Sequence, residues 1–181
     1  MLPFSGSHAV GCFSSTHAKA RGEGDWPDLQ LTLFSVGVFS KFGATMAHAF
    51  GLKYDEMQKY YKHAINRDSY MISVSGARPL SRGYIKLGGS DPYDQLIIEP
   101  NYLGDGPADV DFKVLLEGVK TALILAENTT ALGKNLGSKF TDQHLPGCEQ
   151  YEMRSDRYWE CYIRRYSVTL HHPVGKSCNW K

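Results

Sequence analysis

Two adjacent histidines near the end of the chain, His171 and His172, are the residues best suited to chemistry. They follow Tyr166–Leu170, a run with β-branched residues that predicts a strand pointing the two rings to opposite faces. Pro173 would end that strand, and Gly175 would let the backbone approach another group closely. Because the pKa of histidine lies near neutrality, a rigidly held His172 suits proton transfer. The same local residues also fit a packed or solvated histidine pair without a chemical role.

Cysteine chemistry is a second possibility. Two of the four cysteines, Cys148 and Cys161, flank the polar segment 149–157. They form a disulfide candidate if the protein is exported, and two buried thiols are the alternative. The spacing between His144 and Cys148 does not match a zinc site, and the sequence contains no C-x-x-C. The sequence therefore predicts no metal site.

Composition excludes several classes of function. The chain has 181 residues with 20 basic and 19 acidic side chains, so its net charge of +1 predicts no nucleic-acid partner. Its longest wholly apolar run, 122–126, is too short for a membrane span. The first residues lack the basic start and apolar block of a signal peptide, and the localisation stays unknown. No G-x-G-x-x-G, G-x-S-x-G, Walker or H-E-x-x-H motif occurs.

Alternating apolar and polar residues, bounded by glycine and proline, predict several short strands. Strands are expected at 9–14, 29–34, 69–74, 84–87 and 96–98. Helices are expected at 108–128 and 155–165, with a helical turn or two at 55–63. Strands mixed with segregated helices indicate an α+β fold class with a largely antiparallel sheet backed by helices.

The long helix expected at 108–128 has two informative positions. Asp109 or Asp111 can cap its first turn, because a short carboxylate accepts hydrogen bonds from free backbone amides. Gly118 lies inside the helix, where glycine costs about 1 kcal/mol relative to alanine. Its presence there predicts close packing of the helix against a sheet.

Several longer phrases occur in one order along the chain. They are residues 24–30 (GDWPDLQ), 78–87 (RPLSRGYIKL), 91–94 (DPYD), 98–103 (IEPNYL), 116–120 (LEGVK), 146–148 (PGC), 158–161 (YWEC) and 172–175 (HPVG). Each phrase alone is weak, but the ordered set resembles the C-terminal substrate domain of the glucose-methanol-choline (GMC) oxidoreductases. The resemblance covers residues 9–175 and extends to the insect branch that is similar to glucose dehydrogenase.

The resemblance implies chemistry with flavin adenine dinucleotide (FAD). In this family FAD takes a hydride from an alcohol carbon while a histidine base takes the hydroxyl proton. His172 matches the catalytic histidine, and His171 occupies a neighbouring place expected to meet the substrate. Val174 and Gly175 are expected to contact the cofactor. The implied partner is a small-molecule alcohol or sugar.

The family's sheet covers the flavin, which suggests residues that line the substrate cavity. Phe13, Leu31 and Leu33 are candidates because they lie on the predicted strands. Burial inside the sheet core is the alternative for all three.

The chain also departs from the family pattern. We expect an N-terminal remnant with one strand at 1–24, a substrate-domain-like region at 25–175 and a non-family tail at 176–181. The Rossmann-type domain and the downstream second active-site residue of the family are missing. We therefore expect a fragment truncated at both ends and inactive alone, with an exposed domain interface that favours self-association or instability. The alternative is a non-catalytic relic that binds a ligand or a partner.

Overall fold

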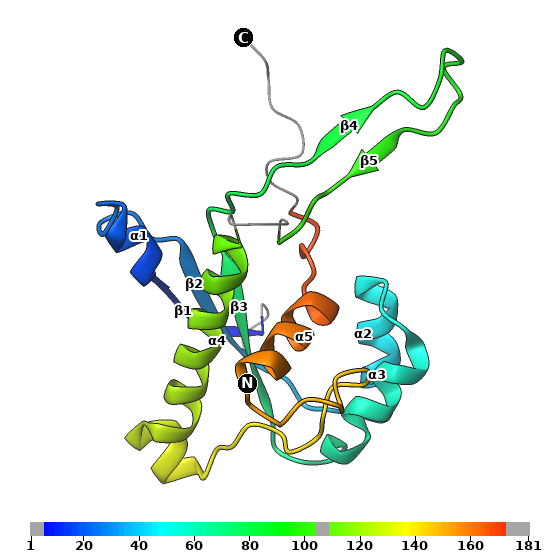
Figure 1. Cartoon of the computed structure of the whole chain (residues 1–181). Helices are drawn as coiled ribbons and strands as arrows, with labels where there is room; N and C mark the ends of the chain where they lie inside the picture. The colour runs from blue at the N-terminus through cyan, green and yellow to red at the C-terminus, as the bar shows by residue number, and fades with distance from the viewer. Residues whose placement is uncertain (1–5, 104–108, 173–181) are drawn as a thin grey trace.

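The computed structural model of the chain describes residues 6–103 and 109–172 (Figure 1). Every strand pairing in these ranges is antiparallel, which confirms the α+β fold class with a largely antiparallel sheet backed by helices. The strands are β1 (Ser7–Phe13), β2 (Leu29–Ser35), β3 (Tyr70–Gly76), β4 (Tyr84–Lys86) and β5 (Ile97–Glu99). The helices are α1 (Thr16–Ala20), α2 (Phe42–Phe50), α3 (Tyr54–Tyr61), α4 (Val110–Asn128) and α5 (Asp156–Tyr166), with a 3-10 turn η1 (Lys62–Ala64) and a π-helical segment η2 (Thr130–Asn135).

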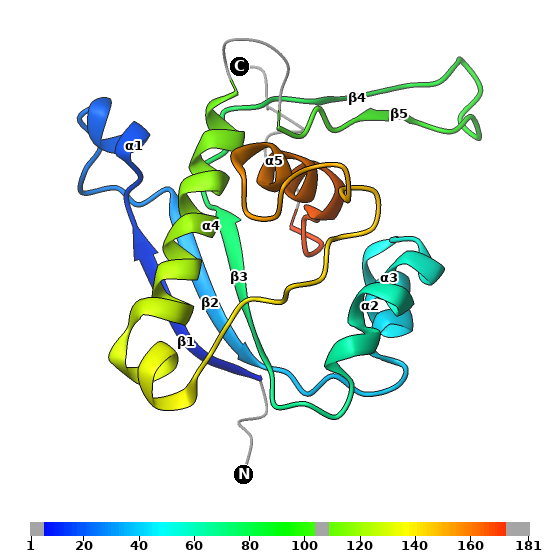
Figure 2. The ribbon, with the colours of Figure 1, turned by 60° about the horizontal axis from the view of Figure 1, so that its bottom comes forward.

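The larger sheet has the strand order β1-β2-β3. Leu31 on the central strand lies opposite Val74 on β3 and Gly11 on β1. Because side chains alternate between the two faces of a strand, Leu29 and Leu31 share one face and Gln30 lies on the other. Leu29 and Leu31 are buried, and Figure 2 shows α4 crossing the sheet. The leucine face of β2 therefore supplies part of the core.

Helix α4 packs closely against the sheet at Gly118. A Cβ atom added to Gly118 would lie 2.5 Å from Val74 Cγ1 and 2.9 Å from Leu29 Cδ2. Both distances are too short for real carbon atoms, so only glycine fits this contact without a shift of its neighbours. The predicted close packing of the helix against a sheet is confirmed.

Replacing this glycine with a branched side chain should destabilise the fold. We expect Gly118→Val to lower the free energy of unfolding by about 2–3 kcal/mol, because overpacking forces buried neighbours off their positions. Gly11→Val on β1 is the matched control, since a Cβ there meets nothing within 4 Å. Urea denaturation followed by circular dichroism measures both variants. Equal unfolding midpoints for Gly118→Val and the wild type would contradict the packing described here.

The first turn of α4 is held differently from the predicted cap. Asp109 stands at the N-cap position, but its side chain makes no capping hydrogen bond. The Asp111 carboxylate accepts from the backbone amides of Leu80 and Ser81, at 2.7 and 2.8 Å. The predicted capping role is therefore wrong for both aspartates, and Asp111 instead fixes the chain that leads into β4 against α4.

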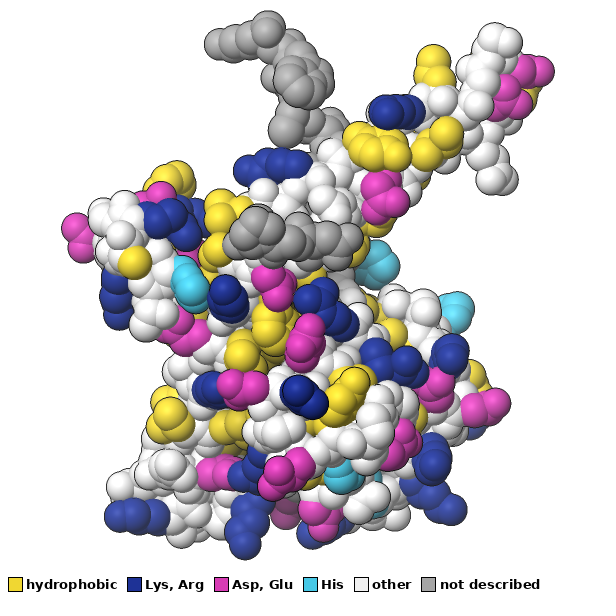
Figure 3. Space-filling view, in the orientation of Figure 1, with side chains coloured by type: hydrophobic (Ala, Val, Ile, Leu, Met, Phe, Trp, Pro, Cys, Tyr) yellow, Lys and Arg dark blue, Asp and Glu magenta, His cyan; other side chains and the backbone are white. Residues whose placement is uncertain are grey.

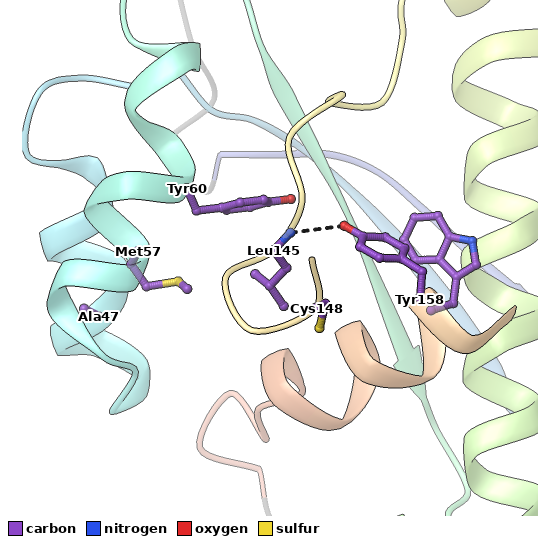
Figure 4. Packing of buried hydrophobic residues seen from close by; sticks show 7 residues of the cluster. Ala47, Met57, Tyr60, Leu145, Cys148 and Tyr158 are labelled. Atoms are coloured by element: carbon purple, nitrogen blue, oxygen red, sulfur yellow. Dashed lines mark hydrogen bonds between the residues drawn. The ribbon is translucent and has the colours of Figure 1, made fainter. Parts of the chain in front are cut away.

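A second core lies between α3, α5 and the loop before α5. Figure 4 shows Tyr60 from α3 and Tyr158 from α5 on either side of Leu145 in that loop. The Leu145 amide donates to the Tyr158 hydroxyl at 3.3 Å. The buried members of this cluster are Ala47, Met57, Tyr60, Leu145, Cys148, Tyr158 and Trp159, and Leu116, Val119 and Leu123 of α4 pack against them. Helix α4 thus joins the second core to the sheet.

Strands β4 and β5 form a separate two-stranded sheet, which we call the arm (residues 84–99). In Figures 1 and 2 the arm extends away from the larger sheet and the helices. Both strands consist of exposed residues. Over the ranges that the structure describes, no helix combines the length and the apolar character needed to cross a membrane.

Candidate active site

Helix α5 positions the histidine pair, and local bonds set both of its ends. The Ser155 hydroxyl caps the helix by accepting from the Tyr158 amide at 3.1 Å. The Ser167 amide donates to the Ile163 carbonyl at 3.0 Å, just after the last helical residue, Tyr166. The final helix predicted from the sequence is therefore confirmed.

The residues after α5 form a turn where a strand was predicted. Leu170 and His171 have φ angles of 50° and 62°, a left-handed conformation that interrupts an extended chain. The His172 amide donates to the Thr169 carbonyl at 3.0 Å and closes the turn. The predicted strand is wrong, and so is the expectation that the two rings point to opposite faces of it. Both His171 and His172 are exposed on this turn.

A disulfide and an arginine tie α5 to its surroundings. Cys148 and Cys161 form a disulfide with Cα atoms 5.9 Å apart, and Cys148 is fully buried. Arg165 Nε donates to the Pro146 carbonyl at 3.1 Å. The same guanidinium pairs with Glu56 of α3 at 3.0 Å. These bonds hold helix α5. The turn at residues 169–172, which we call the histidine turn, follows this helix.

Tyrosine hydroxyls lie between α3 and α5. The hydroxyls of Tyr61 and Tyr166 form a hydrogen bond with each other. Burial raises the pKa of the Tyr60, Tyr162 and Tyr166 hydroxyls above the ordinary tyrosine value. These groups therefore stay neutral at physiological pH, and they brace α5 against α3 rather than act as bases.

A polar surface lies on the reverse of the leucine face of the sheet. Gln30 and Thr32 of β2 pair with Ser75 and Ser73 of β3, so all four side chains share that side. Gln30 Nε2 donates to the Thr32 hydroxyl at 3.1 Å. We call these four side chains the polar sheet face. Thr32 is buried, and the half-buried Gln30, Ser73 and Ser75 carry the amide and hydroxyl groups that are suited to hydrogen bonds with a hydroxylated molecule.

The polar sheet face corrects the cavity residues suggested from the sequence. Phe13, Leu31 and Leu33 share the side of Leu29, which contacts α4 at Gly118. They therefore belong to the α4 side, where Leu31 is buried in the core and Phe13 and Leu33 are half-buried. The polar residues between the leucines were the signal in the sequence that identifies the other face.

Metal chemistry has no candidate in the described residues. In 6–103 and 109–172, no group of three or more His, Cys, Asp and Glu side chains could hold a metal ion. The predicted cofactor contacts, Val174 and Gly175, lie outside the described residues.

Comparison with known protein families shows which family the chain is related to. Residues 79–178, more than half of the sequence, match the family model of the GMC oxidoreductases. The chain belongs to the GMC oxidoreductase family. The matched segment contains the arm, α4, α5 and His172.

Individual proteins that are similar to the chain support the same family. The chain is 39% identical over 113 residues to a glucose dehydrogenase (FAD, quinone) of Drosophila pseudoobscura pseudoobscura, covering 62% of this chain and 17% of the relative. The corresponding Drosophila melanogaster enzyme is 34% identical over the same shares. Arthrobacter globiformis choline oxidase is 25% identical over 72% of this chain and 22% of the relative. The chain thus spans only a small part of the GMC proteins it matches. No solved structure matches it.

Proposed function

We propose that this chain forms the substrate-side part of an FAD-dependent oxidoreductase that oxidises an alcohol or sugar at a CH–OH carbon. The observation that carries the proposal is the position of His172 within the matched GMC segment. Support also comes from the relatives, which include a glucose dehydrogenase, an alcohol dehydrogenase and a choline oxidase.

His172 is the proposed catalytic base. Its ring takes the proton of the substrate hydroxyl, which leaves alkoxide character on the oxygen and weakens the adjacent C–H bond towards hydride loss. FAD, when bound, supplies the hydride acceptor. His171 lies next to this base on the same turn and is proposed to contact the substrate. Val174 and Gly175 are proposed to contact the flavin.

The described residues do not form the pocket that holds the diphosphate of FAD. Such a diphosphate is held where a glycine-rich turn joins a strand to a helix in a parallel βαβ unit. The strand pairings described here are antiparallel, and the sequence has no G-x-G-x-x-G.

A chimaera tests the proposed function. Residues 79–175 of this chain replace the matching segment of the Drosophila melanogaster glucose dehydrogenase. We expect the chimaera to retain flavin after desalting, and glucose or another alcohol to bleach it under anaerobic conditions. The isolated chain, incubated with FAD and desalted, is expected to retain none. A flavin-loaded chimaera that no alcohol reduces would contradict the proposal. Stoichiometric flavin on the isolated chain would show that the chain itself holds the cofactor, against our expectation from its antiparallel strand pairings.

A further inference from the structure

The end of α4 carries a short motif that suits covalent modification. Asn128 is followed by Thr129 and Thr130, which gives the pattern N-x-T without proline in the middle position. None of the other asparagines in the sequence has serine or threonine two residues later. In secreted proteins this pattern is the acceptor of an N-linked glycan. Because so short a pattern also arises by chance, the surroundings of Asn128 must show whether a glycan fits.

The structure leaves both reactive groups of the motif accessible. Asn128 is the last residue of α4, and Asn128 and Thr130 are exposed. In the described ranges, 6–103 and 109–172, neither the Asn128 side-chain amide nor the Thr130 hydroxyl forms a hydrogen bond. The middle residue differs, since the Thr129 hydroxyl donates to the Leu125 carbonyl at 2.7 Å and accepts from the Leu132 amide at 3.3 Å. A glycan on Asn128 therefore breaks no bond of the fold.

An exposed apolar surface lies beside the motif. Ile124 and Leu125 precede Asn128 by four and three residues, so they share its side of the helix. Their side chains are 57% and 39% exposed. In Figure 3, which keeps the orientation of Figure 1, hydrophobic side chains are visible at the lower left of the surface, where α4 ends. A bulky, hydrophilic glycan on Asn128 is suited to cover this surface.

The end of α4 is also well separated from the proposed catalytic residues. In Figures 1 and 2 it lies away from the arm and from the segment that follows α5. A glycan in this place leaves the histidine turn accessible.

The disulfide gives an independent indication of the compartment. Cys148 and Cys161 are bonded, and disulfides form and persist in oxidising environments such as the lumen of the endoplasmic reticulum. N-linked glycans are attached to chains that enter the same lumen. The disulfide and the motif thus require the same cellular route.

We propose that Asn128 is an N-glycosylation site and that its glycan covers Ile124 and Leu125. The donor is an oligosaccharide attached to a lipid pyrophosphate. A bond forms between Asn128 Nδ2 and the first sugar carbon, while the bond from that carbon to the pyrophosphate oxygen breaks. The lipid pyrophosphate leaves with the electron pair, and the amide gives up one proton. This inference does not depend on the proposed function.

Expression of the full chain behind a secretion signal in mammalian cells tests the site. We expect a species of low electrophoretic mobility that peptide-N-glycosidase converts to the unmodified form, leaving aspartate at position 128 in the mass spectrum. Asn128→Gln and Thr130→Ala should abolish this species completely, whereas Thr130→Ser should keep it, because the second hydroxyl is retained. Asn135→Gln is the matched control: Asn135 is also exposed but has glycine two residues later, so the glycan should remain.

A double variant makes a negative result decisive. Asp68→Thr adds an acceptor pattern at the exposed Asn66, and in combination with Asn128→Gln it reports whether the chain reaches the glycosylating compartment. A wild type without glycan beside a glycosylated double variant would overturn the proposal. So would a glycan that persists in Asn128→Gln.

The covering role has a test of its own. Removal of the glycan from the purified chain should raise the fluorescence of an apolar dye such as anilinonaphthalene sulfonate, which binds exposed hydrophobic surface. The variant Ile124→Ser/Leu125→Ser keeps Asn128 and should show no such rise. An unchanged fluorescence in the wild type, or an equal rise in the serine variant, would overturn the covering role.

Discussion

Replacing His172 with alanine in the flavin-loaded chimaera is expected to slow alcohol-driven flavin reduction by roughly 10²–10⁴-fold, the usual contribution of a positioned general base. The substrate must otherwise lose its hydroxyl proton to water, while hydride departure depends on alkoxide character. His172 is exposed at the end of the turn after α5, so the substitution removes a ring without opening a core cavity. The measurement is the anaerobic rate at which the absorbance of oxidised flavin disappears after mixing with glucose.

Two controls separate a base from a structural residue. Bound flavin per protein and the unfolding midpoint should be unchanged in His172→Ala, and added imidazole should restore part of the lost rate. His171→Ala removes the neighbouring ring of the same turn and is expected to raise the substrate concentration needed for half-maximal reduction more than it lowers the limiting rate. An unchanged reduction rate in His172→Ala would remove its proposed role.

Strong period-two patterns predicted the main sheet well. Leu29, Leu31 and Leu33 alternate with polar residues, and this segment is strand β2 with its leucines on the α4 side. Which face of β2 packs against a helix was harder to predict, because alternation defines two faces without identifying either of them. Gly118 supplied the missing information, since a glycine in a long helix marks the point where a sheet comes close.

The histidine turn illustrates what local sequence does not determine. β-branched residues before His171 favour a strand by propensity, but strand propensity depends strongly on the context of neighbouring strands. Here the chain leaves α5 at Tyr166, and left-handed φ angles at Leu170 and His171 turn it before any strand forms. The local pattern therefore predicted the wrong backbone conformation here, and the proposed role of His172 rests on the resemblance to the GMC family alone.

The arm shows a second limit of sequence reading. Its two strands were predicted within one residue at each end, but their segments are only three residues long. Short apolar runs do not reveal whether they are buried or exposed. Pairing of Ile85 with Ile98 was needed to show that the aliphatic residues gather on one face.

Breaking the bond between Cys148 and Cys161 is expected to be the most damaging change to stability. The disulfide closes a short loop with a sequence separation of 13. A disulfide that closes a loop of this size raises the free energy of unfolding by about 3 kcal/mol, mainly because it restricts the unfolded chain. Because Cys148 is fully buried beside the cluster of Tyr158 and Trp159, opening the bond also loosens the loop that holds the start of α5.

The double variant Cys148→Ala/Cys161→Ala should therefore lose about 3 kcal/mol of unfolding free energy, and reductant should shift the wild type in the same direction. Cys12→Ala is the matched control, because Cys12 is exposed on β1 and forms no disulfide. Urea unfolding with and without reductant distinguishes loss of the cross-link from loss of sulfur volume, since only the cross-link responds to reductant. A wild type that unfolds at the same urea concentration in both conditions would contradict a stabilising disulfide. A reductant-sensitive midpoint would instead tie the stable fold, and with it the histidine turn, to an oxidising environment.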